Sequence, residues 1–149
     1  MPALADTLVE NRWLVGPTHA NTLGTTHGGN VLKWMDEVGA MVAMRFAGHN
    51  CVTVRMDQTN FRRPIPVGDT ALVRGYVFDT GETSVRVRLE AYREDPLTGE
   101  RELTTDSYSV YVAIDEDHEP VAVPDLTVDS ERGRALRAEA LEADENGEH

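Results

Sequence analysis

Apolar residues recur at intervals of three and four between Asn30 and Phe46, which is the period of an amphipathic helix. The stripe consists of Val31, Trp34, Met35, Val38, Met41 and Val42, and it is widened by Leu32, Ala40, Ala43 and Phe46. So wide an apolar face predicts a helix that is mostly buried. Thr26 and Asn30 are candidate N-caps, and Gly48 marks the expected end of the helix.

After this helix the period changes from 3.6 to 2, which predicts strands. Val52, Val54 and Met56 alternate with polar residues up to Phe61, and prolines interrupt the pattern shortly afterwards. Three more strand patterns follow at 70–80, 84–94 and 104–116, with turn residues between them, so antiparallel hairpins are expected. A shorter pattern that starts at Arg12 predicts one strand before the helix.

One long helix followed by antiparallel strands predicts an α+β domain in which the sheet covers the helix. The 149 residues suit a single domain, which we expect to span 12–123. Residues 1–11 are expected to be a flexible N-terminus. Residues 124–149 are expected to be an acidic, partly helical tail, with too few large apolar residues to dock firmly.

The charge balance changes the picture of the surface. There are 26 acidic and 14 basic residues, a net charge of −12, and Lys33 is the only lysine. Such a surface repels phosphate, which argues against a nucleic-acid partner. A salt-rich cytoplasm favours it, because the Debye length falls to about 3 Å at 1 M salt and screens the repulsion between carboxylates. A halophilic protein of this kind should loosen as salt is removed.

Other features of the composition restrict the protein class. No apolar run approaches the roughly 18 residues of a membrane span, and the N-terminus lacks a signal-peptide pattern, so we expect a cytoplasmic protein with no membrane span. Cys51 is the only cysteine, which excludes a disulfide within the chain and favours an inert, buried thiol. The five histidines are scattered without the spacing of a zinc site, so no metal is expected.

Candidate chemistry lies at the start and in the middle of the predicted helix. Asp36 sits in the apolar run, where a carboxylate costs free energy unless it is paired or used. Gly28 and Gly29 lack side chains, so a substrate atom could approach the outward-pointing N–H groups at the helix start. These amides could hold an oxyanion, and a carboxylate two turns on could orient a water or attack directly. Taken alone, the glycines could simply start a helix and Asp36 could face water.

Five motifs in order make the reading more specific. They are Asn21, the HGG of 27–29, the MDEVGA of 35–40, the VTVRMD of 52–57 and the F-x-x-P-x-x-V-G-D of 61–69. Together they resemble the hotdog-fold acyl-CoA thioesterases, most of all the cytosolic long-chain acyl-CoA hydrolase and YciA-like branch. The resemblance spans roughly 12–115. It implies a central helix wrapped by a curved antiparallel sheet, a homodimer with sheets joined edge to edge, active sites at the interface, and in this branch a trimer of dimers.

The resemblance also implies roles for individual residues. Asn21 matches the family's catalytic asparagine and Asp36 its catalytic acid, and the two are expected to meet from opposite protomers. Gly28 and Gly29 match the backbone donors. Thr83 and Ser84 match residues that line the path of the pantetheine arm. Coenzyme A is then part of the substrate, and no separate cofactor is expected.

Several neighbouring residues have two readings. His27 could carry protons, but beside two glycines we expect it to fix the loop by hydrogen bonding and to line the site. Arg62 and Arg63 could bind the phosphates of coenzyme A or could pair with nearby carboxylates. Arg86 and Arg88 are read as a solvated ladder of ion pairs rather than a ligand site.

The resulting hypothesis is a hydrolase that cleaves acyl-CoA thioesters. Asp36 would act as general base or nucleophile, the amides near Gly28 and Gly29 would polarise the thioester carbonyl, and Asn21 would position the water or the carbonyl. Trp34 and Met35 could belong to the core or line an acyl tunnel. The alternatives are a hotdog acyl-CoA dehydratase or hydratase and a non-catalytic acyl-CoA sensor.

Overall fold

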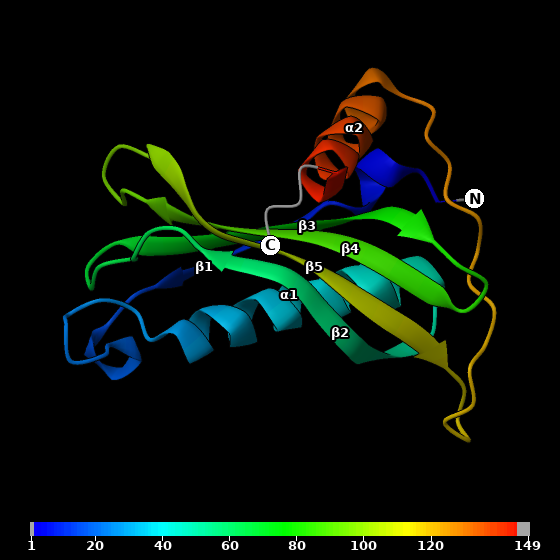
Figure 1. Ribbon diagram of the computed structural model, residues 1–149, viewed down its shortest axis with the longest axis horizontal. Coiled ribbons are helices and arrows are strands. Elements are labelled where there is room, and N and C mark those ends of the chain that lie inside the picture. Colours follow the sequence, from blue (N-terminus) through cyan, green and yellow to red (C-terminus); the bar gives the residue numbers. More distant parts are fainter. Residues whose placement is uncertain (1, 146–149) are drawn as a thin grey trace.

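A five-stranded antiparallel sheet curves around one long helix in the computed structural model, which describes residues 2–145 (Figure 1). The strand order is β1-β3-β4-β5-β2. The strands are β1 (Val9–Leu14), β2 (Asn50–Phe61), β3 (Thr70–Thr80), β4 (Ser84–Glu94) and β5 (Arg101–Ile114). The helices are α1 (Gly28–Ala47) and α2 (Glu131–Glu145), with 3-10 turns at Leu4–Thr7 and Pro17–His19. This is the predicted α+β hotdog fold, and the hairpins β3–β4 and β4–β5 are confirmed.

Helix α1 lies on the concave face of the sheet, where the main apolar core forms. Val38 and Met35 are fully buried, and they share this core with inward-facing residues of β3 and β4 such as Val77 and Leu89. Trp34 is also buried, and its ring stacks on that of Trp13 from β1 at a centroid distance of 5.2 Å. Of the two readings of Trp34 and Met35, the structure of the single chain supports the core.

The ends of α1 differ from the prediction at the start and agree with it at the finish. The helix begins at Gly28, and His27 caps it, not Thr26 or Asn30, because the Nδ1 of His27 accepts a hydrogen bond from the Gly29 N–H at 2.9 Å. Gly48 ends the helix with φ 70°, a left-handed conformation that favours glycine.

The C-terminal segment docks on the outer face of the sheet, where a loose tail was expected (Figure 1). Leu136 and Ala140 of α2 are buried against this face. The hydroxyls of Tyr76 and Tyr108 donate hydrogen bonds to the backbone carbonyls of Leu136 and Ala140. The docking relies on hydrogen bonds to backbone carbonyls and on the packing of a small residue, Ala140. The sequence therefore did not predict it, because large apolar residues are few in this segment.

The N-terminal segment is also packed, contrary to the expectation of a frayed end. Leu4 is fully buried in the same cluster as Leu136. The hydroxyl of Thr7 donates to the Leu4 carbonyl at 2.7 Å and accepts from the Val77 N–H at 2.9 Å. Strand β1 then starts at Val9, three residues before the expected position.

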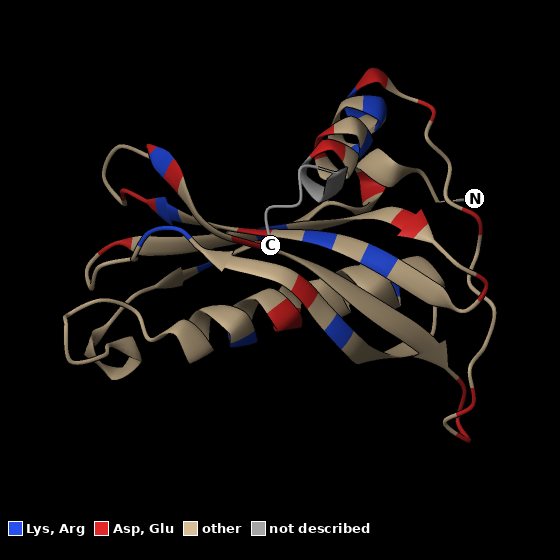
Figure 2. Cartoon of the chain, in the orientation of Figure 1, with Lys and Arg blue, Asp and Glu red and all other residues tan. Residues whose placement is uncertain are grey.

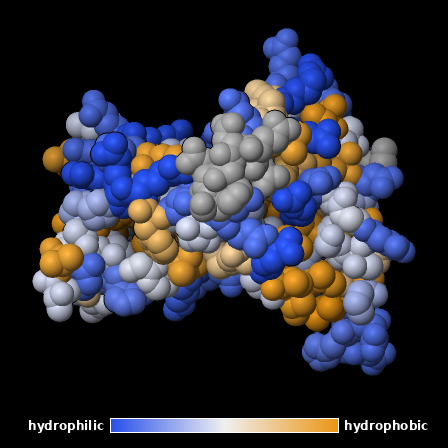
Figure 3. Space-filling model, in the orientation of Figure 1, coloured by the Kyte–Doolittle hydropathy of each residue, from blue (hydrophilic) through white to orange (hydrophobic). Residues whose placement is uncertain are grey.

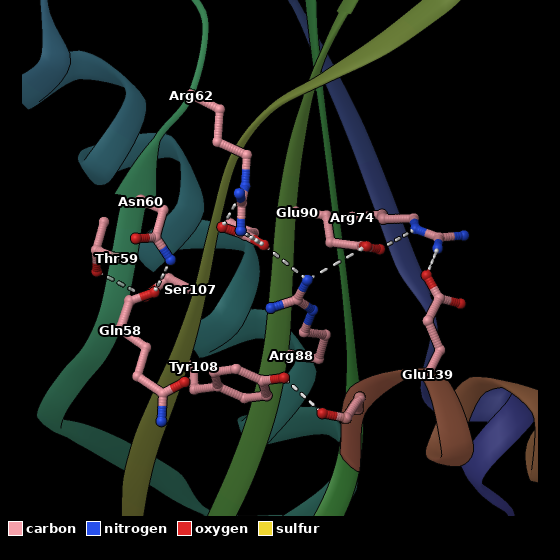
Figure 4. Close-up of polar contacts among 12 residues, drawn as sticks. Gln58, Thr59, Asn60, Arg62, Arg74, Arg88, Glu90, Ser107, Tyr108 and Glu139 are labelled. Carbon is pink, nitrogen blue, oxygen red and sulfur yellow. Dashed lines mark hydrogen bonds and ion pairs between the residues drawn. The ribbon is translucent and has the colours of Figure 1, made fainter. Parts of the chain in front are cut away.

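A buried chain of ion pairs crosses the outer face beneath α2 (Figure 4). Arg88 is only 4% exposed and lies 3.0 Å from Asp106 and 3.7 Å from Glu90. Arg74 continues the chain, at 2.6 Å from Glu90 and 3.5 Å from Glu139 of α2. The prediction of a solvated ladder is therefore wrong for Arg88, because α2 excludes water from this part of the face.

Acidic residues are spread along α2 and the strand ends (Figure 2).

In the part of the chain that the structure describes, no helix is long and apolar enough to cross a membrane.

Candidate active site

The carboxylate of Asp36 is held by two hydroxyl groups. Asp36 lies in the middle of α1, half-buried, on the side that faces β2 and β5. Its Oδ1 accepts hydrogen bonds from the hydroxyl of Thr53 on β2 at 2.9 Å and from that of Tyr111 on β5 at 3.0 Å. Both donors are neutral, so the negative charge is stabilised without an opposite charge beside it.

Tyr111 reaches Asp36 through a notch in α1. The tyrosine is fully buried, and its hydroxyl also lies 3.3 Å from the backbone carbonyl of Asp36. A Cβ atom on Gly39 would lie 2.0 Å from this hydroxyl, so only glycine leaves room for it. Burial first, and then the nearby charge of Asp36, raise the pKa of Tyr111 far above its usual value, and the hydroxyl therefore stays a donor.

Asn21 closes the loop that precedes the helix. Its Oδ1 accepts hydrogen bonds from the N–H groups of Leu23 at 2.9 Å and Thr25 at 3.2 Å, and its Nδ2 donates to the Thr25 hydroxyl at 2.9 Å. Asn21 is half-buried, and the next residues lead directly to the N-terminus of α1. Within one chain its side chain has a loop-fixing role.

A pocket of about 290 Å³ opens at the N-terminus of α1. Its walls include Thr26, Gly28, Val31, Phe61, Arg62 and Arg63. Gly28 is the first residue of the helix, so its N–H has no acceptor inside the helix, and none is found elsewhere in 2–145. The Gly29 N–H donates to His27 instead, which corrects the expectation that both amides are open to an oxyanion.

One chain does not bring Asp36 to this pocket. Asp36 follows Gly28 by eight residues, which is about 12 Å along a helix axis. The pocket is lined by Phe61, which lies close to Gly28 and at the opposite end of β2 from Thr53. The prediction that a carboxylate two turns along the same helix acts at this pocket is therefore wrong for a single chain.

The two arginines at the pocket are paired with carboxylates. Arg62 uses Nε and Nη2 to bind Asp106, at 3.3 and 3.2 Å, and so joins the ion-pair chain of the outer face (Figure 4). Arg63 is more exposed and lies 3.7 Å from Glu102. Both still line the pocket, so a negatively charged ligand there would compete for them with these acids.

Thr83 and Ser84 form the turn between β3 and β4. The Thr83 carbonyl accepts from the Ala113 N–H at 3.0 Å, and Ser84 begins β4. The next residue, Val85, pairs with Tyr111, which pairs in turn with Thr53. The turn therefore lies at the same level of the sheet as the Asp36 cluster, two strands from β2.

Sequence reasoning assigned no role to Thr53 or Tyr111. Thr53 is part of the VTVRMD motif, so a signal for it was present in the sequence. Tyr111 is separated from Asp36 by 75 positions and looks like one more apolar residue of an alternating strand. Only the fold places its hydroxyl on the carboxylate.

Other chemistry is sparse at this site. Within residues 2–145, no cluster of His, Cys, Asp and Glu has the arrangement of a metal site. Cys51 is half-buried near Tyr111, and burial raises the pKa of its thiol, which favours the unreactive protonated form.

A sheet wrapped around one helix, with a half-buried carboxylate on that helix and a pocket at the helix start, is the arrangement expected of a hotdog thioester hydrolase. The comparison with family models agrees, because residues 23–100 match the model of the Thioesterase superfamily. The chain belongs to this superfamily, and the predictions of family and enzyme class are confirmed.

Individual relatives place it more closely. The acyl-CoA thioester hydrolase YciA of Salmonella typhimurium is 32% identical over 117 residues, which cover 76% of this chain and 87% of the relative. The crystal structure of an apo-hexameric acyl-CoA thioesterase has a TM-score of 0.86 and 35% identity, and covers 99% of this chain and 96% of that one.

An acyl-CoA hydrolase from Staphylococcus aureus was solved in complex with butyryl coenzyme A and coenzyme A. It has a TM-score of 0.87 and 26% identity, with 98% of this chain and 89% of that chain covered. Its structure is also known for variants in which one asparagine, one aspartate or one threonine is replaced by alanine.

Proposed function

We propose that this protein hydrolyses acyl-CoA to a free fatty acid and coenzyme A, with Asp36 as the catalytic carboxylate. The observation that carries the proposal is the half-buried Asp36 held by the hydroxyls of Thr53 and Tyr111. The spacing of the replaced residues in the Staphylococcus aureus hydrolase supports it. There the asparagine lies 15 residues before the aspartate and the threonine 17 after it, as Asn21, Asp36 and Thr53 do here.

The complete site is proposed to form between two protomers. Asp36 contacts β2, which is an edge of the sheet and therefore offers unpaired N–H and C=O groups to a second chain. Val52 and Val54 of β2 are 44% and 57% exposed, and apolar side chains gather on the surface over this end of β2 and β5 (Figure 3). Pairing two β2 edges would carry Asp36 of one protomer toward the partner's pocket, and three such dimers would give a hexamer.

The reaction needs no group beyond those of the protein and water. The thioester carbonyl oxygen would accept a hydrogen bond from the Gly28 N–H and feel the positive end of the α1 dipole. As general base, Asp36 would take a proton from water while the hydroxide oxygen bonds to the carbonyl carbon. The tetrahedral oxyanion then expels the thiolate of coenzyme A, which takes the proton from Asp36. As nucleophile, Asp36 would form an anhydride that water hydrolyses.

The remaining residues would bind the substrate. Asn21 would orient the water or the carbonyl from the loop before α1, and His27 would keep the helix start in shape. Thr83 and Ser84 would line the pantetheine arm. Arg63, with its weaker and more exposed ion pair, is the better placed of the two arginines to bind a phosphate.

A panel of acyl-CoA substrates from acetyl to palmitoyl, followed by detection of free thiol, tests the activity. The protein should release coenzyme A, and Asp36→Asn should abolish most turnover while leaving the oligomer intact. Glu37→Gln is the matched control, because Glu37 is an exposed acid on the same helix. Full activity in Asp36→Asn would refute the assignment. Hydration of an enoyl-CoA without thiol release would favour a hydratase instead.

The acidic surface supports a second part of the proposal, that the enzyme works in a salt-rich cytoplasm. The excess carboxylates that give the 149 residues a net charge of −12 repel one another, and salt screens this repulsion. The melting temperature and the thiol-release rate should both rise between low and molar potassium chloride. Equal melting temperatures at the two salt concentrations would contradict this part and leave the catalytic assignment untouched.

A further inference from the structure

We infer that Tyr111 is a positioning residue of the reaction, which with the notch at Gly39 anchors Oδ1 of Asp36 and leaves Oδ2 as the reacting oxygen. The inference rests on the proposed function, because it concerns the same carboxylate. It goes further by naming a residue on β5 and by assigning different roles to the two oxygens of one side chain.

The two hydrogen-bond donors converge on a single oxygen. Thr53 and Tyr111 approach Oδ1 from neighbouring strands, at 2.9 and 3.0 Å, and these two residues pair in the register of β2 and β5. Among residues 2–145, no donor to Oδ2 is found. An oxygen with two donors is a poor base and a poor nucleophile, because both donors stabilise its negative charge. The other oxygen keeps the lone pairs that the reaction needs.

The notch explains how a buried tyrosine can serve this purpose. Gly39 lies almost one turn after Asp36 on α1, and a Cβ there would lie 2.0 Å from the Tyr111 hydroxyl and 2.9 Å from its Cζ. The hydroxyl therefore occupies the space of a missing side chain and reaches both the carbonyl and the carboxylate of Asp36. A buried ring inserted in this way is held by its neighbours, so the position of its hydroxyl oxygen is fixed.

Among residues 2–145, no ion pair to the Asp36 carboxylate is found. From β4 the neighbouring residues are Val85 and Val87, and from β2 the titratable neighbour is Cys51. Lys33 and Glu37 of α1 itself are exposed to solvent. The orientation of the carboxylate therefore depends on the two hydroxyls.

The test compares Tyr111→Phe with Tyr76→Phe in the full oligomer. Both replacements remove one fully buried hydroxyl that donates to a carbonyl or carboxylate, but Tyr76 bonds Leu136 on the outer face. Tyr111→Phe should lower kcat for a good acyl-CoA substrate about 10- to 100-fold, with little change in KM. Tyr76→Phe should keep the kcat and KM of the unmodified enzyme.

Gly39→Ala provides an independent variant if Tyr111→Phe folds poorly, because it displaces the hydroxyl while keeping the tyrosine. It should lower kcat in the same direction. An unchanged kcat in either variant would overturn the inference, and so would equal losses in Tyr111→Phe and Tyr76→Phe. If the unmodified enzyme turns over and Asp36→Asn does not, these results refute the positioning role alone. If the unmodified enzyme releases no thiol, the proposed function fails and the inference fails with it.

Discussion

Buried charged groups have different kinds of partner on the two faces of the sheet. On the outer face, Arg88, Glu90 and Asp106 are almost fully buried and each has a partner of opposite charge. On the concave face, Asp36 is the carboxylate that contacts the core, and its hydrogen bonds come from neutral hydroxyls. The outer charges are neutralised and covered by α2, whereas the charge of Asp36 is stabilised on one oxygen only.

The difference separates structure from chemistry. A buried ion pair is costly to break because its members then lose both water and partner, so the outer network holds the fold together without being free to react. A carboxylate that is held by neutral donors keeps its charge and its second oxygen, which is what general-base or nucleophilic catalysis requires. Burial alone therefore does not identify a functional acid, but the nature of its partners does.

The largest predicted effect comes from the concave face. Asp36→Asn should lower kcat/KM about 10²- to 10⁴-fold, because the amide can neither accept a proton from water nor attack the carbonyl. The melting temperature should change little, since Thr53 and Tyr111 can still donate to the amide oxygen. Thiol-release kinetics and thermal unfolding measure the two quantities. A variant that keeps most of its activity, or one that loses its fold, would remove the contrast between the faces.

A substitution on the outer face should lower stability and leave activity unchanged. Arg88→Met leaves Glu90 and Asp106 without their shared partner, and it should cost about 3 kcal/mol of unfolding free energy. Arg74 and Arg62 still pair with these acids, which limits the loss. Urea denaturation measures the change, and kcat per folded molecule is expected to stay the same. An unfolding midpoint equal to that of the unmodified protein would show that the network contributes nothing.

A smaller effect is expected at alkaline pH. Burial first, and then the charge of Glu90, raise the pKa of Tyr92 to about 12, above the ordinary value of 10.0. The folded state thus prefers the neutral phenol, so this contribution to stability is complete below pH 10 and is lost as the pH rises from 10 to about 12. The ultraviolet absorbance of tyrosinate should show this late titration, and Tyr92→Phe should remove it. Titration of Tyr92 near pH 10 in the folded protein would contradict the prediction.

Much of the fold could be predicted from periodicity because local patterns determine it. The strand patterns at 70–80 and 84–94 match β3 and β4, and the apolar stripe matches α1 to within two residues. The docking of α2 could not be predicted, since it depends on tyrosine hydroxyls that meet backbone carbonyls 60 and 32 residues away. Arg88 was misread for the same reason, because what covers a strand face is not a property of the strand.

The candidate site was predictable only in part. The motifs pointed to Asp36, Asn21 and the glycine pair, and the family resemblance implied that Asn21 and Asp36 meet from opposite protomers. The donors Thr53 and Tyr111 come from strands that meet α1 only in the folded chain. The use of the Gly29 amide by His27 is likewise a matter of side-chain geometry that residue types alone do not reveal.

Mixing two inactive variants tests the central claim most directly. Asp36→Ala and Asn21→Ala would be unfolded together, refolded at equal concentration and assayed for thiol release. If each site takes Asn21 from one protomer and Asp36 from its partner, random pairing restores about a quarter of the unmodified activity, because half of the dimers carry one intact site of two. Hybrid dimers that form in the expected proportion and remain inactive would contradict the account.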